Sequence, residues 1–354
     1  MSRRVVVAMS GGVDSSVAAA LVAASGAEAF GVTLKLLPGS PTGFGCCGSP
    51  EDMADAKRVC ATLGIPHYVV DLAEVFERDV IAPFVREYAA ARTPNPCVEC
   101  NRSVKFGAFL RLAEAWQADA VATGHYARVE PDGEGFRLRR AVGEGKDQTY
   151  FLHSLGPAEL GKVLFPVGEL TKAEVRAKAR ELGLATADKA ESQEICFVPG
   201  GDYRALLRDR VPEALVPGPV RGADGRELGR HAGLAAYTLG QRRGLGLSSG
   251  ARLYVTGMDA ATNTLQVGPE EDARRGVLVV GRVSWTRTAP APKTPVRVRA
   301  RHRGTLAPAV LFPEPDGRWR AELSEPLHAP APGQSAVFYD GDAVLGGGII
   351  LEAR

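Results

Sequence analysis

The chain has 354 residues, of which 45% are hydrophobic and 24% charged, and it carries a formal net charge of only +2. This composition is ordinary for a globular protein, and the length predicts two or three domains rather than one core. No apolar run approaches the ~20 residues of a membrane span, so we expect no membrane-spanning helix and no membrane partner.

The first half alternates short apolar runs with helical patterns. Strands are expected at 5–8, 29–36, 67–71 and 120–123, and helices at 15–25, 51–63, 72–91 with an interruption at Pro83, 105–117 and 171–182. This alternation predicts an α/β fold with a doubly wound parallel sheet. The turns at the carboxyl ends of its strands would lie together at the edge where such sheets bind ligands.

The first strand leads directly into a glycine turn. The turn and its flanks are Ala8, Met9, Ser10, Gly11, Gly12, Val13, Asp14 and Ser15. Its glycines and the following helix N-terminus suit an anion. It lacks the Gly-Lys-Ser/Thr end of a Walker A loop, and it resembles the pyrophosphate loop of enzymes that split ATP into AMP and pyrophosphate. The alternative is a glycine-serine turn that opens an unrelated helix.

Six cysteines are present, at 46, 47, 60, 97, 100 and 196. The N-terminus shows no hydrophobic signal segment, so we expect a cytoplasmic protein with reduced thiols. Cys97 and Cys100 form a Cys-x-x-Cys pair on a proline-rich loop that precedes a helix, and Cys196 stands alone far along the chain. Such a pair in a reducing compartment suggests metal or redox chemistry.

The second half is rich in glycine, proline and short β-type runs. Strands are expected at 277–285, 296–301, 309–312, 319–323, 335–339 and 345–351, which predicts a small barrel. We expect domains at 1–204, 205–275 with mostly β structure, and 276–354.

Basic residues are concentrated in one part of the chain. Residues 226–303 hold 14 basic and 5 acidic side chains, against 29 basic and 36 acidic side chains in the remainder, which favours a polyanionic partner or a solvated basic face. Arg297, Arg299, Arg301 and Arg303 alternate, so all four are expected on one face of a strand.

Several motifs in a fixed order resemble one family over essentially the whole chain. They are the pyrophosphate loop, Thr93-Pro94-Asn95-Pro96 before Cys100-Asn101, residues 122–128, 146–152, 195–197 and 237–246, and the C-terminal stretches 332–339 and 346–350. Together they resemble the bacterial tRNA-specific 2-thiouridylases. The resemblance implies a first domain of the adenine nucleotide alpha hydrolase-like type, a central tRNA-contacting domain and a tRNA-binding β-barrel.

The resemblance implies ATP-dependent 2-thiolation of the wobble uridine. ATP would lie on residues 8–15 with Leu34 and Gly124, and Mg²⁺ would assist at the pyrophosphate. Asp14 could bind that metal or cap the helix. The C2 oxygen would be adenylated, Cys196 would bear the persulfide, and Cys100 would act as nucleophile and form a transient disulfide with it.

The resemblance also assigns tRNA contacts. The residues concerned are Asn95, Pro96 and Cys97 at the target base, with His125, Lys146, Asp147, Gln148, Arg299, Ala300 and Gln334. Cys97 stands where some members carry Asp, which weakens an acid–base role there. Ala300 stands where the family has Tyr and cannot stack on a base.

Two enzymatic alternatives remain open at this point. Cys97, Cys100 and Cys196 could hold a [4Fe–4S] cluster that carries the sulfur, which would change the mechanism. A pyrophosphate-loop amide or amidine synthetase would explain the ATP loop but neither the cysteines nor the basic later domains. The expected partners of the thiolation enzyme are tRNA and a persulfide donor protein, either a cysteine desulfurase or a sulfur-relay carrier, and a monomer is expected when it is free.

Overall fold

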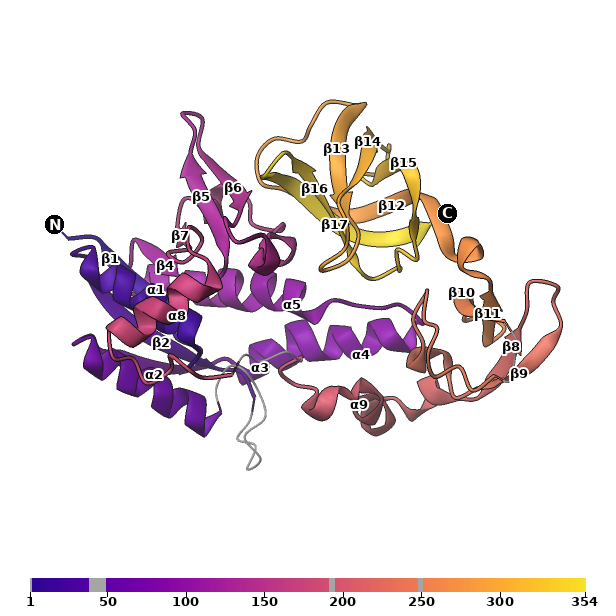
Figure 1. Cartoon of the computed structure of the whole chain (residues 1–354), viewed down its shortest axis with the longest axis horizontal. Coiled ribbons are helices and arrows are strands. Elements are labelled where there is room, and N and C mark those ends of the chain that lie inside the picture. Colours follow the sequence, from indigo (N-terminus) through magenta and orange to yellow (C-terminus); the bar gives the residue numbers. More distant parts are fainter. Residues whose placement is uncertain (1, 38–48, 191–194, 248–250) are drawn as a thin grey trace.

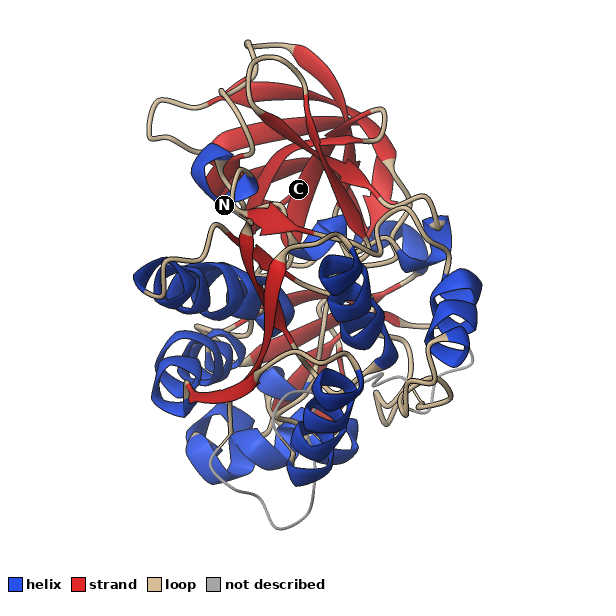
Figure 2. Cartoon of the chain, turned by 90° about the vertical axis from the view of Figure 1, so that its left-hand side faces the viewer, coloured by secondary structure: helices blue, strands red, loops and turns tan. Residues whose placement is uncertain are grey.

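The computed structural model describes residues 2–37, 49–190, 195–247 and 251–354. Cys46 and Cys47, and part of the segment before Cys196, lie outside the described residues. An N-terminal body of helices around a parallel sheet carries a barrel on one side, and a smaller sheet lies at the far end (Figures 1 and 2). In the part of the chain that the structure describes, no helix is both long and apolar enough to cross a bilayer.

The N-terminal body is built on a parallel sheet in the order β3-β2-β1-β4-β7. Its strands are β1 Arg4–Ala8, β2 Glu28–Lys35, β3 His67–Asp71, β4 Ala120–Ala122 and β7 Val163–Leu164. β1 lies in the centre, where Val7 pairs with Gly31 of β2 and with Ala122 of β4. The predicted doubly wound α/β fold is therefore confirmed, and the ends of β1 and β4 place the glycine turn beside Gly124.

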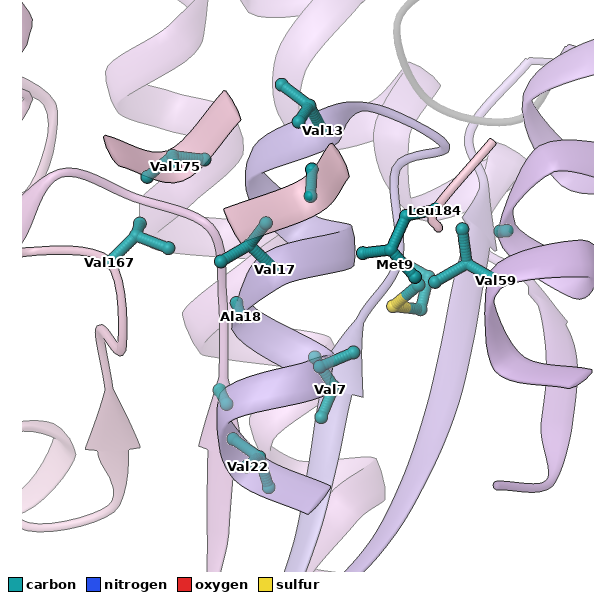
Figure 3. Close-up of a cluster of buried hydrophobic side chains, with 14 of the residues drawn as sticks. Val7, Met9, Val13, Val17, Ala18, Val22, Val59, Val167, Val175 and Leu184 are labelled. Carbon is teal, nitrogen blue, oxygen red and sulfur yellow. The ribbon is translucent and has the colours of Figure 1, made fainter. Parts of the chain in front are cut away.

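Helices cover both faces of this sheet and bury two apolar clusters. The helices of this part of the chain are α1 Val13–Ala24, α2 Pro50–Thr62, α3 Ala73–Phe76, α4 Ala82–Ala89, α5 Pro96–Glu99, α6 Phe109–Ala115, α7 Pro157–Leu160, α8 Lys172–Glu181 and α9 Tyr203–Arg210, of which α5 and α7 pack in a third cluster instead. Figure 3 shows one cluster, in which Val17 of α1 lies near Val7 of β1 and Val175 of α8. Burying each such side chain contributes about 1.5–3 kcal/mol, which holds the N-terminus of α1 firmly against the sheet.

Two π-helical segments lie within the helical runs, at Glu77–Ile81 and Cys100–Ala108. The first ends just before Pro83, so the helix continues through the predicted interruption into α4. The helix expected from Lys105 begins earlier, at Pro96, because Asn95 caps it and accepts a hydrogen bond from the Val98 amide at 3.4 Å. Cys97 and Cys100 therefore lie on a helix and not on the predicted loop.

The middle sheet has the order β10-β11-β8-β9. Its strands are β8 Gly218–Arg221, β9 Glu227–His231, β10 Tyr254–Asp259 and β11 Thr264–Gly268. Val220, Val255 and Leu265 are fully buried and form its core with Tyr237 and Leu245. The mostly-β character expected of this region is confirmed.

The C-terminal strands close into a barrel because β12 pairs with both β15 and β17. They are β12 Arg274–Trp285, β13 Thr294–Arg299, β14 Ala307–Pro313, β15 Trp319–His328, β16 Ser335–Asp340 and β17 Ala343–Ala353. The predicted barrel is confirmed. A hairpin of the N-terminal body, β5 Ala127–Pro131 and β6 Phe136–Arg140, extends this sheet through the pair Ala343–Arg139. The hairpin was not predicted, and it ties the two bodies together.

Candidate functional site

The glycine turn after β1 forms a tight cradle at the N-terminus of α1. Gly11 has φ +73°, and a Cβ there would lie 2.4 Å from the carbonyl oxygen of Asp52, so only glycine fits. A Cβ at Gly124 would lie 2.6 Å from the Ser15 amide. The N-cap is Gly12, which offers no side-chain hydrogen bond to the first turn of α1. The cradle therefore suits an anion that takes the place of a capping side chain.

Leu34 forms part of the apolar side of the same edge. It lies near the carboxyl end of β2, is 6% exposed, and belongs to the buried cluster that also contains Ala8. Its expected place beside a nucleotide agrees with this position and also with a simple core role.

Asp14 lies in the first turn of α1, and both of its carboxylate oxygens are engaged. Lys172 Nζ donates to them at 2.7 and 2.9 Å, and the Tyr126 hydroxyl donates at 2.7 Å. The helix-capping alternative for Asp14 is wrong because Gly12 occupies the N-cap. An oxygen ligand such as this carboxylate fits Mg²⁺, which would share it with Lys172 or replace Lys172.

Lys172 was missed by the sequence reasoning, which located the start of its helix but not the element that this start faces. Thr171 and Glu174 form a capping box at the start of the helix expected at 171–182, which makes Lys172 the first residue of α8. Its side chain is only 15% exposed, with Nζ 5.9 Å from the centre of the Tyr126 ring. The start of α8 thus places the Lys172 ammonium group beside the glycine turn.

Cys100 and Cys196 belong to one buried cluster although they are far apart in sequence. Cys100 is 8% exposed and begins the π-helical segment, while Cys196 is partly buried against the same cluster. The neighbouring Phe197 fixes the Cys196 segment, because its ring lies 5.1 Å from Phe84 and 5.7 Å from Phe76. Leu34 belongs to the same cluster, and Ala8, at the end of β1, packs against it.

The other described cysteines have different surroundings. Cys97 is exposed on the first turn of α5, and Cys60 is buried against Gly31 in the other cluster. Burial raises the pKa of the Cys60 thiol to about 11, so this thiol stays protonated at neutral pH and packs as a core side chain. Within residues 2–37, 49–190, 195–247 and 251–354, no three His, Cys, Asp or Glu side chains form a group suited to a metal ion. The set Cys97, Cys100 and Cys196 therefore does not fit a cluster as it is arranged here.

His125 is buried rather than turned toward an RNA surface. Its Nδ1 lies 2.7 Å from the Thr123 hydroxyl, and its ring packs between Phe106 and Phe165. Desolvation and, to a smaller extent, the positive charge of Lys105 lower the pKa of His125 well below its ordinary value. The ring is therefore neutral near pH 7, and in this conformation His125 supports the core beside Gly124.

The segment 146–148 lies at the junction of the N-terminal body and the barrel. Asp147 is buried and accepts hydrogen bonds from Arg299 at 2.9 Å and Arg140 at 3.3 Å. Gln148 binds the backbone of Tyr126 through both its side chain and its amide. Lys146 is half-buried. Asp147 and Gln148 therefore hold internal contacts in this conformation, where the resemblance assigned them to tRNA.

The barrel residues expected to meet RNA also face inward in part. β13 ends at Arg299, whose guanidinium pairs with Asp147, and Arg303 has φ +60° beyond the strand. The prediction of four arginines on one exposed face is therefore wrong. Ala300 is buried in the barrel core, and Gln334 Nε2 donates to the Thr93 carbonyl at 2.8 Å. Gln334 thus holds the loop that leads to Asn95 and Cys97.

Three family models match the chain. Residues 3–200 match the model described as tRNA methyl transferase HUP domain, 204–269 the tRNA methyl transferase PRC-barrel domain, and 275–350 the aminomethyltransferase beta-barrel domain. A solved structure of NMN synthetase from Francisella tularensis is similar over 54% of this chain and 67% of that chain, with 19% identity and a TM-score of 0.33.

Curated relatives match over nearly the full length. "tRNA-specific 2-thiouridylase MnmA" of Chloroflexus aggregans is 51% identical, with 98% of both chains covered. The protein of the same name from Roseiflexus sp. (strain RS-1) is 49% identical over 98% of this chain and 99% of its own. That of Heliobacterium modesticaldum is 46% identical over 99% and 93%.

Proposed function

The chain belongs to the family of tRNA-specific 2-thiouridylases, and from this premise we propose that it replaces the C2 oxygen of the wobble uridine in tRNA by sulfur at the expense of ATP. The observation that carries the proposal is that Cys100 and Cys196, from distant parts of the chain, pack in the same apolar cluster as Leu34 and Ala8. This supports a site in which the two thiols act in one reaction on the side of the sheet where β1 leads into the anion cradle. Methyl transfer would require neither the anion cradle nor the two thiols.

The first step is adenylation of the uridine. The C2 oxygen attacks the α-phosphate of ATP, the bond to the β-phosphate breaks, and pyrophosphate leaves. This converts a poor leaving group into AMP. The amides at the start of α1 and the hydroxyls of Ser10 and Ser15 hold the triphosphate, with Leu34 and Gly124 beside the nucleotide. Mg²⁺ neutralises charge on the pyrophosphate when bound, and Asp14 is the residue that would hold it.

The second step transfers sulfur. Cys196 carries a persulfide whose terminal sulfur attacks C2, and AMP leaves with the former C2 oxygen. The Cys100 thiolate then attacks the Cys196 sulfur, which breaks the S–S bond and leaves the electron pair on the sulfur attached to C2. The products are 2-thiouridine and a Cys100–Cys196 disulfide, which a cellular dithiol reduces. A persulfide donor protein reloads Cys196.

Exposed arginines of the later domains support tRNA binding. Arg226, Arg230, Arg242, Arg243, Arg252, Arg297, Arg301 and Arg303 are exposed, and within the described ranges none lies within 4.0 Å of a carboxylate oxygen. Unpaired guanidinium groups of this kind suit the phosphate backbone. They would hold the tRNA while Asn95, Pro96 and Cys97 contact the target base. Cys97 is the exposed member of this segment, and no acid–base role is assigned to it.

The proposal is tested with the purified chain, Mg²⁺-ATP, a persulfide donor and an unmodified tRNA transcript with uridine at the wobble position. We expect 2-thiouridine by nucleoside mass spectrometry, and no product from Cys100→Ser or Cys196→Ser. Both variants should still bind ATP. Cys60→Ala, which lies in the other cluster, serves as the control and should retain thiolation. Near-wild-type thiolation by either serine variant would contradict the assignment of the two cysteines.

A further inference from the structure

A continuous series of polar contacts joins the barrel to the ATP cradle. Arg299 of β13 donates to Asp147, the next residue Gln148 binds Tyr126, and the Tyr126 hydroxyl donates to Asp14. The series starts on a strand of the proposed tRNA-binding barrel and ends on the carboxylate proposed to hold Mg²⁺.

The middle contact is a two-point clamp. The Tyr126 amide donates to Gln148 Oε1 at 2.8 Å, and the Gln148 amide donates to the Tyr126 carbonyl at 2.9 Å. Two antiparallel bonds between the same residues prevent one segment from moving without the other. Asp147 is fixed in turn, because its second oxygen accepts from the Thr149 hydroxyl at 2.7 Å.

The end of the series is equally constrained. Tyr126 is 2% exposed, and Gly124 packs so closely on the turn that a Cβ would touch the Ser15 amide. A displacement of segment 146–148 therefore reaches the turn through Tyr126. The hydroxyl donates at 2.7 Å to the Asp14 oxygen that Lys172 also contacts at 2.7 Å.

We infer that Tyr126 is a positioning residue that couples tRNA binding to ATP binding. The inference rests on the proposed function, because it takes the barrel, to which segment 146–148 is joined through Arg299, as tRNA-binding. tRNA that moves this segment would orient Asp14 toward Mg²⁺-ATP, so bound tRNA would raise the affinity for ATP. Because coupling between two sites is reciprocal, ATP would raise the affinity for tRNA by the same factor. Such coupling would make ATP bind preferentially to the tRNA-bound enzyme.

Tyr126→Phe tests the inference because it removes only the hydroxyl and keeps the ring packed. Affinity for α,β-methylene-ATP with Mg²⁺ is measured by calorimetry with and without the unmodified transcript, and transcript affinity is measured with and without the analogue. In the unaltered chain we expect each ligand to strengthen the other by roughly tenfold or more. In Tyr126→Phe both factors should fall together toward one, about the effect of losing one hydrogen bond to a charged group.

Tyr68→Phe is the matched control, because Tyr68 is 53% exposed and lies outside this series. It should leave both factors unchanged. The inference is overturned if the unaltered chain shows no coupling, or if Tyr126→Phe weakens the analogue equally with and without tRNA. Failure of the proposed function would appear separately, as absence of 2-thiouridine from the unaltered chain.

Discussion

The described thiols differ sharply in surroundings, and this determines their reactivity. Cys60 is fully buried with a pKa raised to about 11 by desolvation, whereas Cys97 is exposed on α5. Because the thiolate is the reactive form, iodoacetamide at pH 8 should alkylate Cys97 and spare Cys60 until denaturant is added. Peptide mass spectrometry reports both sites. Rapid native labelling of Cys60 would contradict its place in the core.

Asp14 is the carboxylate most directly tied to the ATP cradle. Asp14→Asn removes its charge and leaves Lys172 beside a neutral amide. We expect tRNA-dependent pyrophosphate release to fall by roughly ten- to a hundredfold, the effect of losing charged hydrogen bonds. tRNA affinity should change little, because the exposed arginines lie in the later domains. Equal loss of both would mean that Asp14 has mainly a structural role.

At the scale of single elements, the arginines of β13 and of the segment just after it have different surroundings. Arg297 and Arg301 are exposed, whereas Arg299 is 9% exposed and paired with Asp147. The double variant Arg297→Ala, Arg301→Ala should flatten the plot of log tRNA affinity against log salt by roughly one unit per lost phosphate contact. The thermal midpoint should stay unchanged. An unaltered slope would show that these two guanidinium groups do not meet phosphate.

Arg299→Ala is the contrasting change on the same strand. It leaves the buried Asp147 carboxylate without its barrel partner, and breaking such a pair typically costs about 3–5 kcal/mol. Because Arg140 remains, we expect the lower end of that range, seen as a lower thermal midpoint. A midpoint equal to that of the unaltered chain would show that the interdomain pair adds no stability.

The elements set by local pattern were predictable, and those set by distant contacts were not. The apolar run before Gly11 and the capping box at Thr171 fixed β1 and the start of α8. Hairpin β5–β6 was missed because its strands are only partly apolar and its outer partner is β17, far along the chain. The early start at Pro96 was missed because the Asn-Pro pair was read as a loop.

In the candidate site, the glycine turn could be predicted from the spacing of its residues. The side-chain pairs that join separate elements of the fold could not. No local signal in the sequence pairs Asp147 with Arg299 or Lys172 with Asp14, because each pair joins separate elements. The family assignments for His125 and Gln334 likewise gave no indication that both have internal partners in this conformation.

At the scale of the whole molecule, buried histidines make the fold sensitive to acid. Burial lowers the pKa of His153 from 6.5 to about 4, at the contact with Ser335 of the barrel. Between these values the unfolded chain binds more protons, so the free energy of unfolding falls as the pH drops below about 6.5. At pH 5 the loss from His153 is about 2 kcal/mol, or roughly 4–8 °C in the thermal midpoint.

Calorimetric scans at pH 7.5 and 5.0 measure this effect. His153→Gln keeps an amide donor for Ser335 but cannot titrate in this range, so its midpoint should decline less between the two values. A midpoint for the unaltered chain that is equal or higher at pH 5.0 would contradict the neutral, buried state of these rings.

In the proposed reaction, sulfur passes from Cys196 to an adenylated uridine and Cys100 completes the transfer. The most direct measurement is a single turnover of persulfide-loaded enzyme with ATP and excess transcript, without reductant. We expect 2-thiouridine, AMP, pyrophosphate and a Cys100–Cys196 disulfide in equal amounts, with the disulfide identified by peptide mass spectrometry. Formation of 2-thiouridine while Cys100 and Cys196 both remain free of that disulfide would contradict the account.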